Sequence, residues 1–418
     1  MSATAAAPQN AWPAWPAEGL ARVPYWVYQD AALYADEQQK IFRGATWNFL
    51  CLDAELPGPE TWRTSNIGEM PVVVTRDAGG ELAAFENRCA HRGALLCFKP
   101  CGEAKEIACV YHNWTYDLKG NLQGVAFRRG IKGSGGMLPD AQPASNAPAK
   151  VHIENYHGLI FGTLSDATPS VETYLGAEVA AKVRRVMKAP VKSLGGYSQM
   201  LANNWKLYME NVKDTYHASL LHLFFAKFRI NRLTQKGGVI VGGDGGCHVS
   251  FTIESPSKNA SGDEYEKAGM RSAAGDFKLE APEVLDAVDE FGDGGAVQII
   301  GVFPGVVLQQ IKNCLAVRRI VPRGLYETEL LWTAFGYADD DDNLTAMRLQ
   351  QANLIGPAGF ISMEDGAATG FVQRGAIAAG ERSAVVEMGG RGVESNESRV
   401  TETSVRGFWQ AWRGHIGI

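Results

Sequence analysis

The 418-residue sequence has no apolar run that approaches the roughly 18 residues needed to span a bilayer. Residues 1–20 lack the basic region and the apolar stretch of a secretory signal. Basic residues are outnumbered, with 40 Lys and Arg against 46 Asp and Glu and a net charge of −6, which argues against binding to nucleic acid or another general polyanion. We therefore expect a cytoplasmic protein with neither a membrane nor a nucleic-acid partner.

Cysteine is scarce, with seven residues in the whole chain. An odd number in a long chain argues against a secreted disulfide framework and favours metal binding in a reducing compartment. Four of the seven cysteines lie within residues 89–112, together with two histidines. Such a density of thiol and imidazole groups predicts a metal site.

The pattern of apolar residues divides the chain into two regions. Residues 45–165 contain short β-branched runs separated by Gly, Asn and Asp, which predicts a compact all-β domain. Residues 166–418 combine helical spacing, over 170–188 and 203–225, with alternating segments over 296–337 that indicate three consecutive antiparallel strands. The predicted fold class is therefore α+β, with helices packed against an antiparallel sheet in the second region.

The first candidate metal site combines Cys89-x-His91 with Cys109-x-x-His112. Each half supplies one thiolate and one imidazole from a short loop, and two such loops can hold either one tetrahedral ion or a two-iron cluster. Zinc is the simpler alternative, because two cysteines and two histidines are a common zinc ligand set. The order Cys-His then Cys-His argues against zinc, since the usual zinc finger pairs Cys with Cys and His with His.

A second candidate site lies in the helical segment 203–225, which contains Asp214, His217 and His222. Asp214 and His217 are three residues apart and would share one face of a helix. His217 and His222 are five residues apart, about 140° around a regular helix. They can converge on one ion only if the helix breaks or bulges between them, so the histidine pair by itself leaves open whether a metal binds.

The residues around both sites resemble those of one known family. His91 continues as His-Arg-Gly and His112 as His-Asn-Trp-Thr-Tyr, like the two ligand loops of the Rieske [2Fe–2S] domain. Asn-Trp-Lys at 204–206 and Asp-x-Tyr-His-x-x-x-x-His at 214–222 resemble the mononuclear iron motif of Rieske non-heme iron oxygenases. Over nearly its whole length, the chain is similar to the large (alpha) subunit of aromatic-ring-hydroxylating oxygenases.

This resemblance implies a Rieske domain over 45–165, a catalytic iron domain of the helix-grip type over 166–418, and an N-terminal segment, 1–44, that packs on the catalytic domain. It implies that the [2Fe–2S] cluster is held by Cys89, His91, Cys109 and His112. Cys97 and Cys101 would then lie between the ligand loops without binding the metal.

The resemblance also implies that His217 and His222 bind a mononuclear Fe(II). Such an iron needs a carboxylate as its third ligand, which leaves open positions for oxygen. Glu364 and Asp365 are adjacent in the matching late helix. The family pattern favours Asp365, and Glu364 is the alternative.

Asp214 matches the catalytic carboxylate that links the two metal sites between subunits of the family's trimers, from His112 of one chain to His217 of the next. Asn211 matches a pocket position near the iron. The sequence has no G-x-G-x-x-G fingerprint after a strand and no second cysteine set, so electrons from NAD(P)H must arrive through a separate reductase, with or without a ferredoxin. A small beta subunit in an α₃β₃ assembly is implied by resemblance alone.

The expected substrates are O₂ and a small aromatic carboxylate. Within the family, the chain resembles members that act on benzoate-type acids, which implies cis-1,2-dihydroxylation of terephthalate; the alternative is salicylate 5-hydroxylation or oxidation of another benzoate. A dicarboxylate needs a cation at each end of its pocket, and the arginine fork suits a carboxylate. Arg318 and Arg319 must face opposite sides of a strand; the resemblance favours Arg318 for one end, with Arg399 for the other. The remaining candidates are Arg229, Arg232, Arg374 and Arg391.

Two alternatives belong to other classes of protein. A zinc-stabilised binding protein would be colourless when purified, whereas a Rieske protein is red-brown. A simple electron carrier would hold only the Rieske cluster, with two irons per chain in place of three.

Overall fold

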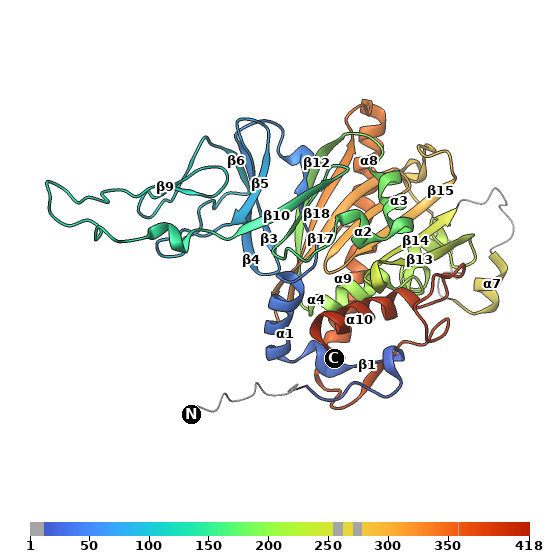
Figure 1. Cartoon of the computed structure of the whole chain (residues 1–418). Helices are drawn as coiled ribbons and strands as arrows, with labels where there is room; N and C mark the ends of the chain where they lie inside the picture. The colour runs from blue at the N-terminus through green and yellow to red at the C-terminus, as the bar shows by residue number, and fades with distance from the viewer. Residues whose placement is uncertain (1–11, 254–261, 271–277, 358) are drawn as a thin grey trace.

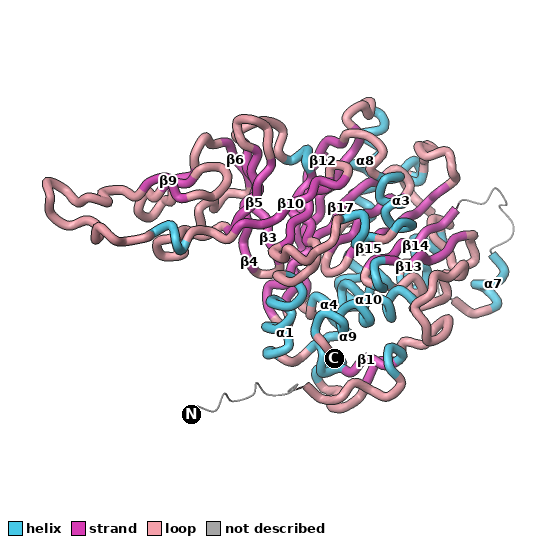
Figure 2. The backbone as a smooth tube through the Cα atoms, in the orientation of Figure 1, coloured by secondary structure: helices cyan, strands magenta, loops and turns pink. Residues whose placement is uncertain are grey.

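The computed structural model describes residues 12–253, 262–270, 278–357 and 359–418 (Figure 1). A slender all-β body lies at the left of Figure 1, and a larger body of sheet and helices lies at the right; Figure 2 shows the same division by element type. Within these four ranges, no helix combines the length and the apolar character needed to cross a membrane.

The slender body contains two antiparallel sheets. The larger has seven strands in the order β2 (Asn48–Leu52), β11 (Leu159–Thr163), β10 (Lys150–Tyr156), β5 (Leu82–Glu86), β4 (Met70–Arg76), β3 (Thr61–Ile67) and β6 (Cys101–Glu103). The smaller consists of β7 (Ile107–Ala108), β8 (Thr115–Tyr116) and β9 (Leu122–Gly124), and it points away from the rest of the molecule (Figure 1). The all-β character predicted for this region is confirmed.

The larger body is built on one antiparallel sheet of seven strands. Their order is β12 (Val191–Leu201), β18 (Glu327–Tyr337), β17 (Cys314–Gly324), β16 (Val306–Ile311), β15 (Gly295–Val302), β14 (Cys247–Ile253) and β13 (Gly237–Gly242). The prediction of three strands over 296–337 was wrong in number, because the chain turns back at the cis Phe303–Pro304 bond and makes four. A two-stranded sheet joins β1 (Arg22–Pro24) to β19 (Ser383–Val385).

Helices cover both faces of this large sheet. One face packs against α2 (Val171–Leu175) and α3 (Ala177–Val186), which Gly176, with φ of 76°, separates within the predicted 170–188 helix. The other face packs against α4 (Trp205–Lys213) and α10 (Thr403–Ile416). The remaining α-helices of the described ranges are α1 (Ala31–Glu37), α5 (Ala218–Leu221), α6 (Leu223–Lys227), α7 (Gly262–Lys267), α8 (Asp342–Ile355) and α9 (Phe360–Ile377).

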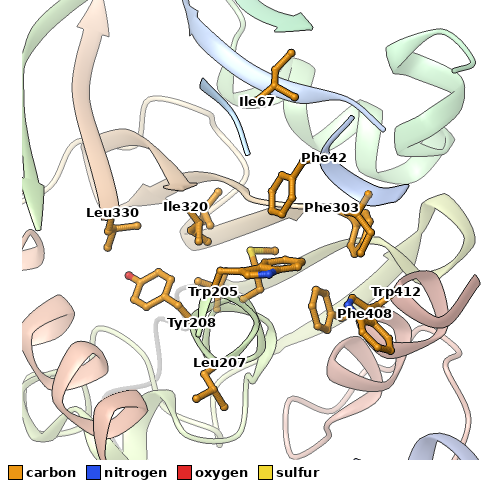
Figure 3. Close-up of a cluster of buried hydrophobic side chains, with 14 of the residues drawn as sticks. Phe42, Ile67, Trp205, Leu207, Tyr208, Phe303, Ile320, Leu330, Phe408 and Trp412 are labelled. Carbon is orange, nitrogen blue, oxygen red and sulfur yellow. The ribbon is translucent and has the colours of Figure 1, made fainter. Parts of the chain in front are cut away.

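Helix α4 is anchored in a large hydrophobic cluster, with Trp205 at its centre (Figure 3). The Trp205 ring packs edge-on against Phe42 and Phe408, with centroids 5.0 and 5.9 Å away. The fully buried Glu37 of α1 lies 2.6 Å from Lys206 Nζ and also accepts a hydrogen bond from Trp205 Nε1. Removing one partner of a buried pair costs about 3–5 kcal/mol, so α1 helps to fix the helix that leads into the second candidate site.

Candidate active site

The two Cys-His loops of the slender body have the same backbone geometry despite their different spacing. In each loop the cysteine N–H donates to the carbonyl five residues further on, at 2.8 Å, and the cysteine carbonyl accepts from the N–H four residues on. Those fourth residues, Gly93 and Asn113, have positive φ angles of 76° and 54°. Gly and Asn are the residues that best tolerate this conformation, so the local sequence dictates the loops that present Cys89 and Cys109.

The four donors are arranged as a buried pair of sulfurs and an exposed pair of imidazoles. Cys89 and Cys109 are buried, and the Tyr116 hydroxyl lies 3.2 Å from Cys89 Sγ. His91 and His112 are exposed, with their Nδ1 atoms 3.0 Å apart. Two cysteines on one side and two histidines on the other match the two unlike irons of a Rieske cluster.

A single zinc ion does not fit these donors. Zinc at about 2.0–2.3 Å from each ligand holds its donor atoms within about 4 Å of one another. In the described part of the chain, a single set of three or more such donors has all its donor atoms within 4.8 Å of one another. That set belongs to the larger body and does not include the Cys-His donors. The Cys-His donors are therefore spread more widely than one ion would hold them.

The second candidate site lies directly after α4, where the chain departs from helical geometry. Asp214 follows the last residue of α4 with extended backbone angles, and the short helices α5 and α6 are separated at His222, whose ψ is 88°. Because of these two breaks, the His217 and His222 rings converge, with centroids 5.3 Å apart. The break in the helix that a shared metal ion requires between the two histidines is therefore present.

His217, His222 and Asp365 make up the compact donor set. Asp365 Oδ1 lies 3.4 Å from His217 Nε2 and 3.1 Å from His222 Nε2. Burial alone would raise the pKa of Asp365, but the two histidines outweigh it and hold that pKa well below its usual range. Two imidazoles and one buried carboxylate with free positions around them are the donors that non-heme Fe(II) takes.

Two further carboxylates approach the outer nitrogens of these histidines. Glu364 Oε2 lies 2.8 Å from His222 Nδ1, and Asp214 Oδ2 lies 3.3 Å from His217 Nδ1. Burial lowers the pKa of His217, but Asp214 and Asp365 outweigh it and raise that pKa to about 10. Glu364 is therefore placed behind His222, and not among the three converging donors; the sequence alone gave no signal for this position.

The donor set lies in the wall of a pocket that encloses about 660 Å³ not filled by atoms, including open solvent at its mouth. Arg318 lies in the same wall, 6% exposed. Its Nη1 donates to the Tyr208 hydroxyl at 3.0 Å, and its Cζ lies 4.8 Å from the Trp332 ring centroid. The Arg318 Nε has no hydrogen-bond acceptor among the described residues. Its neighbour Arg319 points to the opposite face, where it donates to Leu50 O and Ser65 Oγ.

Arg399 also lines the pocket, and it is held from behind. Its Nη1 donates to Asn231 Oδ1 and its Nη2 to Arg232 O, whereas its Nε finds no acceptor in the described ranges. Burial lowers the pKa of Arg399 to about 10. Asn211, also in the wall, donates to Asp365 Oδ1 at 3.3 Å. The other candidates do not appear among the described residues of this wall: Arg229, Arg232, Arg374 and Arg391.

Comparison with known proteins gives consistent matches over both bodies. The Rieske [2Fe-2S] domain model matches residues 46–133, and the ring hydroxylating alpha subunit (catalytic domain) model matches residues 178–417. The chain is 52% identical over 396 residues to the terephthalate 1,2-dioxygenase terminal oxygenase component subunit alpha 2 of Comamonas sp, with 95% of each chain covered. It is 43% identical over 402 residues to the anthranilate 1,2-dioxygenase large subunit of Burkholderia cepacia, covering 96% of this chain and 95% of that one.

A solved structure shares the fold. The naphthalene 1,2-dioxygenase from Rhodococcus sp. bound to indole superposes with a TM-score of 0.77 at 22% identity, and 94% of each chain is covered. At this identity the likeness concerns the fold alone, with its all-β body and helix-covered antiparallel sheet.

The fold and the two donor sets define an oxidoreductase of the Rieske oxygenase class, with a [2Fe–2S] cluster and a mononuclear iron. More particularly, the chain belongs to the ring-hydroxylating alpha subunits. Members of this family are terminal oxygenases that take electrons from partner proteins, often together with a beta subunit. The assignment made from the sequence is confirmed, and the zinc-protein and electron-carrier alternatives were wrong.

Proposed function

We propose that the chain is the catalytic subunit of a dioxygenase that adds both atoms of O₂ to the ring of terephthalate and yields the cis-1,2-dihydrodiol. Two electrons from NAD(P)H and two protons balance the reaction. One observation carries this proposal: the pocket that contains the His217, His222 and Asp365 donors also contains two arginines, and the Nε of each has no acceptor among the residues that the structure describes. The relatives named for terephthalate and anthranilate oxidation support an aromatic carboxylate as substrate.

In this proposal Cys89, His91, Cys109 and His112 hold the cluster, and His217, His222 and Asp365 hold the iron. When bound, the iron activates O₂ and the cluster supplies an electron to it. Residues 45–165 would form the Rieske domain and residues 166–418 the catalytic domain.

The carboxylates around the histidines act as positioning groups. Glu364 accepts a hydrogen bond from His222 Nδ1–H, and Asp214 is placed to do the same for His217 Nδ1–H. Each contact favours the tautomer whose Nε2 is free to bind a metal, and fixes the ring orientation. Asn211 holds the Asp365 carboxylate through its 3.3 Å contact with Oδ1.

Arg318 and Arg399 would bind the two carboxylates of the substrate. Both guanidinium groups are held by protein contacts, so little side-chain freedom is lost when a carboxylate binds. The wall also contains the apolar side chains Val297, Ile299 and Ile361, which suit the faces of a benzene ring. The substrate would thus be fixed at both ends beside the iron ligands, with water excluded from its ring.

Electron transfer would take place between chains. The small sheet of β7, β8 and β9, whose first two strands flank His112 in the sequence, lies in Figure 1 at the end of the slender body that is turned away from α4 and α9. His217 and His222 follow α4 and flank α5, and Asp365 is in α9. Both cluster histidines are exposed, and the Asp214 side chain is 26% exposed, so each side of such a contact is accessible in the single chain. We therefore infer a trimer in which Asp214 links His217 to His112 of the neighbouring subunit, in an α₃β₃ assembly served by a reductase with or without a ferredoxin.

A single-turnover experiment tests the substrate and the chemistry together. The holoprotein is reduced chemically under anaerobic conditions, terephthalate and then O₂ are added, and the quenched products are analysed by mass spectrometry. A product heavier than terephthalate by two oxygens and two hydrogens is expected. No product from terephthalate, together with a hydroxylated product from salicylate, would contradict the proposed substrate and leave the family assignment intact.

A further inference from the structure

Within the described ranges, the substrate pocket contains polar atoms without hydrogen-bond partners in addition to those of its two arginines. Gln309 of β16 is fully buried, and neither its Nε2 nor its Oε1 has a hydrogen-bond partner among the described residues. Thr252 of β14 is 1% exposed, and its Oγ1 is likewise unpartnered. Both residues line the pocket. A buried polar group without a partner costs about 1–3 kcal/mol, so a bound ligand is the natural partner for these groups.

The strand register places Gln309 beside Arg318. Gln309 is directly opposite Ala316 on β17, and Arg318 is two residues further along that strand. Residues in this diagonal relation lie on the same face of the sheet, roughly 7–8 Å apart, within reach of long side chains. The thiol of Cys314 also approaches the Gln309 amide, but a thiol is a weak hydrogen-bonding partner.

The strand register likewise places Thr252 close to Arg399. Its direct cross-strand partner is Gly237 on β13, and a Cβ built on Gly237 would lie 3.1 Å from Arg399 Nε. Directly opposite side chains point to the same face of a sheet. The Thr252 hydroxyl and the Arg399 Nε are therefore directed to the same part of the pocket.

The two groups lie at opposite ends of an apolar strip. Strand β15 runs between β14 and β16 and contributes Val297, paired with Thr252, and Ile299, paired with Gln309. Two strand spacings, about 10 Å, therefore separate the Thr252 and Gln309 strands. A benzene ring with carboxylates at its two ends can bridge such a length through hydrogen bonds.

We propose that Gln309 and Thr252 are specificity-determining residues, each donating a second hydrogen bond to the carboxylate held by the adjacent arginine. This inference deepens the proposed function and rests on it. Each end of the pocket would then offer one charged and one neutral donor. A carboxylate only accepts hydrogen bonds, so it satisfies both donors, whereas a methyl group or a hydrogen at that end of the ring leaves both buried and unpaired.

Equilibrium binding to the oxidised holoenzyme tests this without turnover. Isothermal titration calorimetry without reductase gives the Kd of terephthalate for the wild type, Gln309→Met and Thr252→Val. Loss of a hydrogen bond to a charged group is expected to weaken terephthalate binding about tenfold or more in each variant. Benzoate has one carboxylate, so at most one of the two substitutions should weaken its binding.

Gln310→Met is the matched control. Gln310 is as buried as Gln309, but it is on the opposite face, where it bonds Arg185 and the carbonyls of Gly295 and Lys312. Gln310→Met should lower the melting temperature and leave the Kd unchanged, whereas Gln309→Met should raise the Kd without lowering the melting temperature of the ligand-free protein.

Three outcomes decide the matter. A terephthalate Kd within twofold of the wild type in both variants would overturn the inference, while product from the wild-type enzyme would leave the proposed function standing. No terephthalate binding by the wild type would overturn both. A raised Kd for Gln309→Met together with an additive effect of Arg318→Met would overturn the shared subsite, because groups that bind one carboxylate must be coupled.

Discussion

Replacing Glu364 should weaken iron binding without removing any of the three converging donors. Its Oε2 lies 2.8 Å from His222 Nδ1 and holds the ring with Nε2 directed at Asp365. Loss of such an outer partner typically costs 10–100-fold in metal affinity, about 1.4–2.7 kcal/mol. Because the Glu364 side chain is 32% exposed, solvent screens its charge, and we expect the lower end of this range, about tenfold, for Glu364→Met. Glu364→Gln keeps an acceptor oxygen and should lose less.

The assay is anaerobic Fe(II) titration of the iron-depleted mononuclear site in competition with a chromogenic chelator. The visible spectrum of the Rieske cluster serves as an internal control, since Glu364 is in the other body of the chain and should not affect it. Glu381, which is exposed beyond the end of α9, provides the matched control Glu381→Gln. Iron affinity of Glu364→Met equal to that of the wild type would refute the positioning role, and complete loss of iron would indicate that Glu364 is itself a ligand.

Three further predictions follow from the described contacts. Asp214→Ala should keep both metals but lose nearly all turnover, because the ligand atoms remain while the link between subunits is removed; metal analysis with steady-state product formation checks this, and an active variant would contradict it. Arg318→Met should weaken terephthalate binding by about 10–150-fold, or about 1.5–3 kcal/mol, in calorimetry, whereas Arg319→Met, on the opposite face, should leave the Kd unchanged. Burial raises the pKa of Glu210 to about 7 against the donors Tyr28 Oη and Trp409 Nε1. Its contribution to the free energy of unfolding is therefore fully present below pH 4.5 and falls by about 3 kcal/mol as the pH rises through 7. Glu210→Gln should remove this decline, which urea titrations of the wild type and the variant at pH 5 and pH 8 can measure. An equal loss of stability between the two pH values in both proteins would contradict it.

Features that depend on residues close together in the chain could be predicted from short stretches of sequence. The positive φ required at Gly93 and Asn113 is a local property, so both Cys-His loops could be predicted from short motifs. Strand alternation alone separated Arg318 from Arg319, and the spacing of His217 and His222 already required a break in the helix. The number of strands over 296–337 was predicted less well, because the turn at Phe303–Pro304 lies within a continuous apolar pattern.

Which distant groups meet depends on the tertiary packing of the chain. It brings Asp365 to the two histidines and places its neighbour Glu364 behind His222, across 142 residues of chain. It also leaves Gln309 in the pocket without a hydrogen-bond partner among the described residues, although the adjacent Gln310 is hydrogen-bonded through both its amide atoms on the other face. Strand alternation places Gln309 and Gln310 on opposite faces, but the local pattern does not show which face borders the pocket, because that depends on how helices and strands far apart in sequence pack around it. Local sequence specifies loops and strand faces, whereas the environment of a buried polar side chain is set by its non-local neighbours.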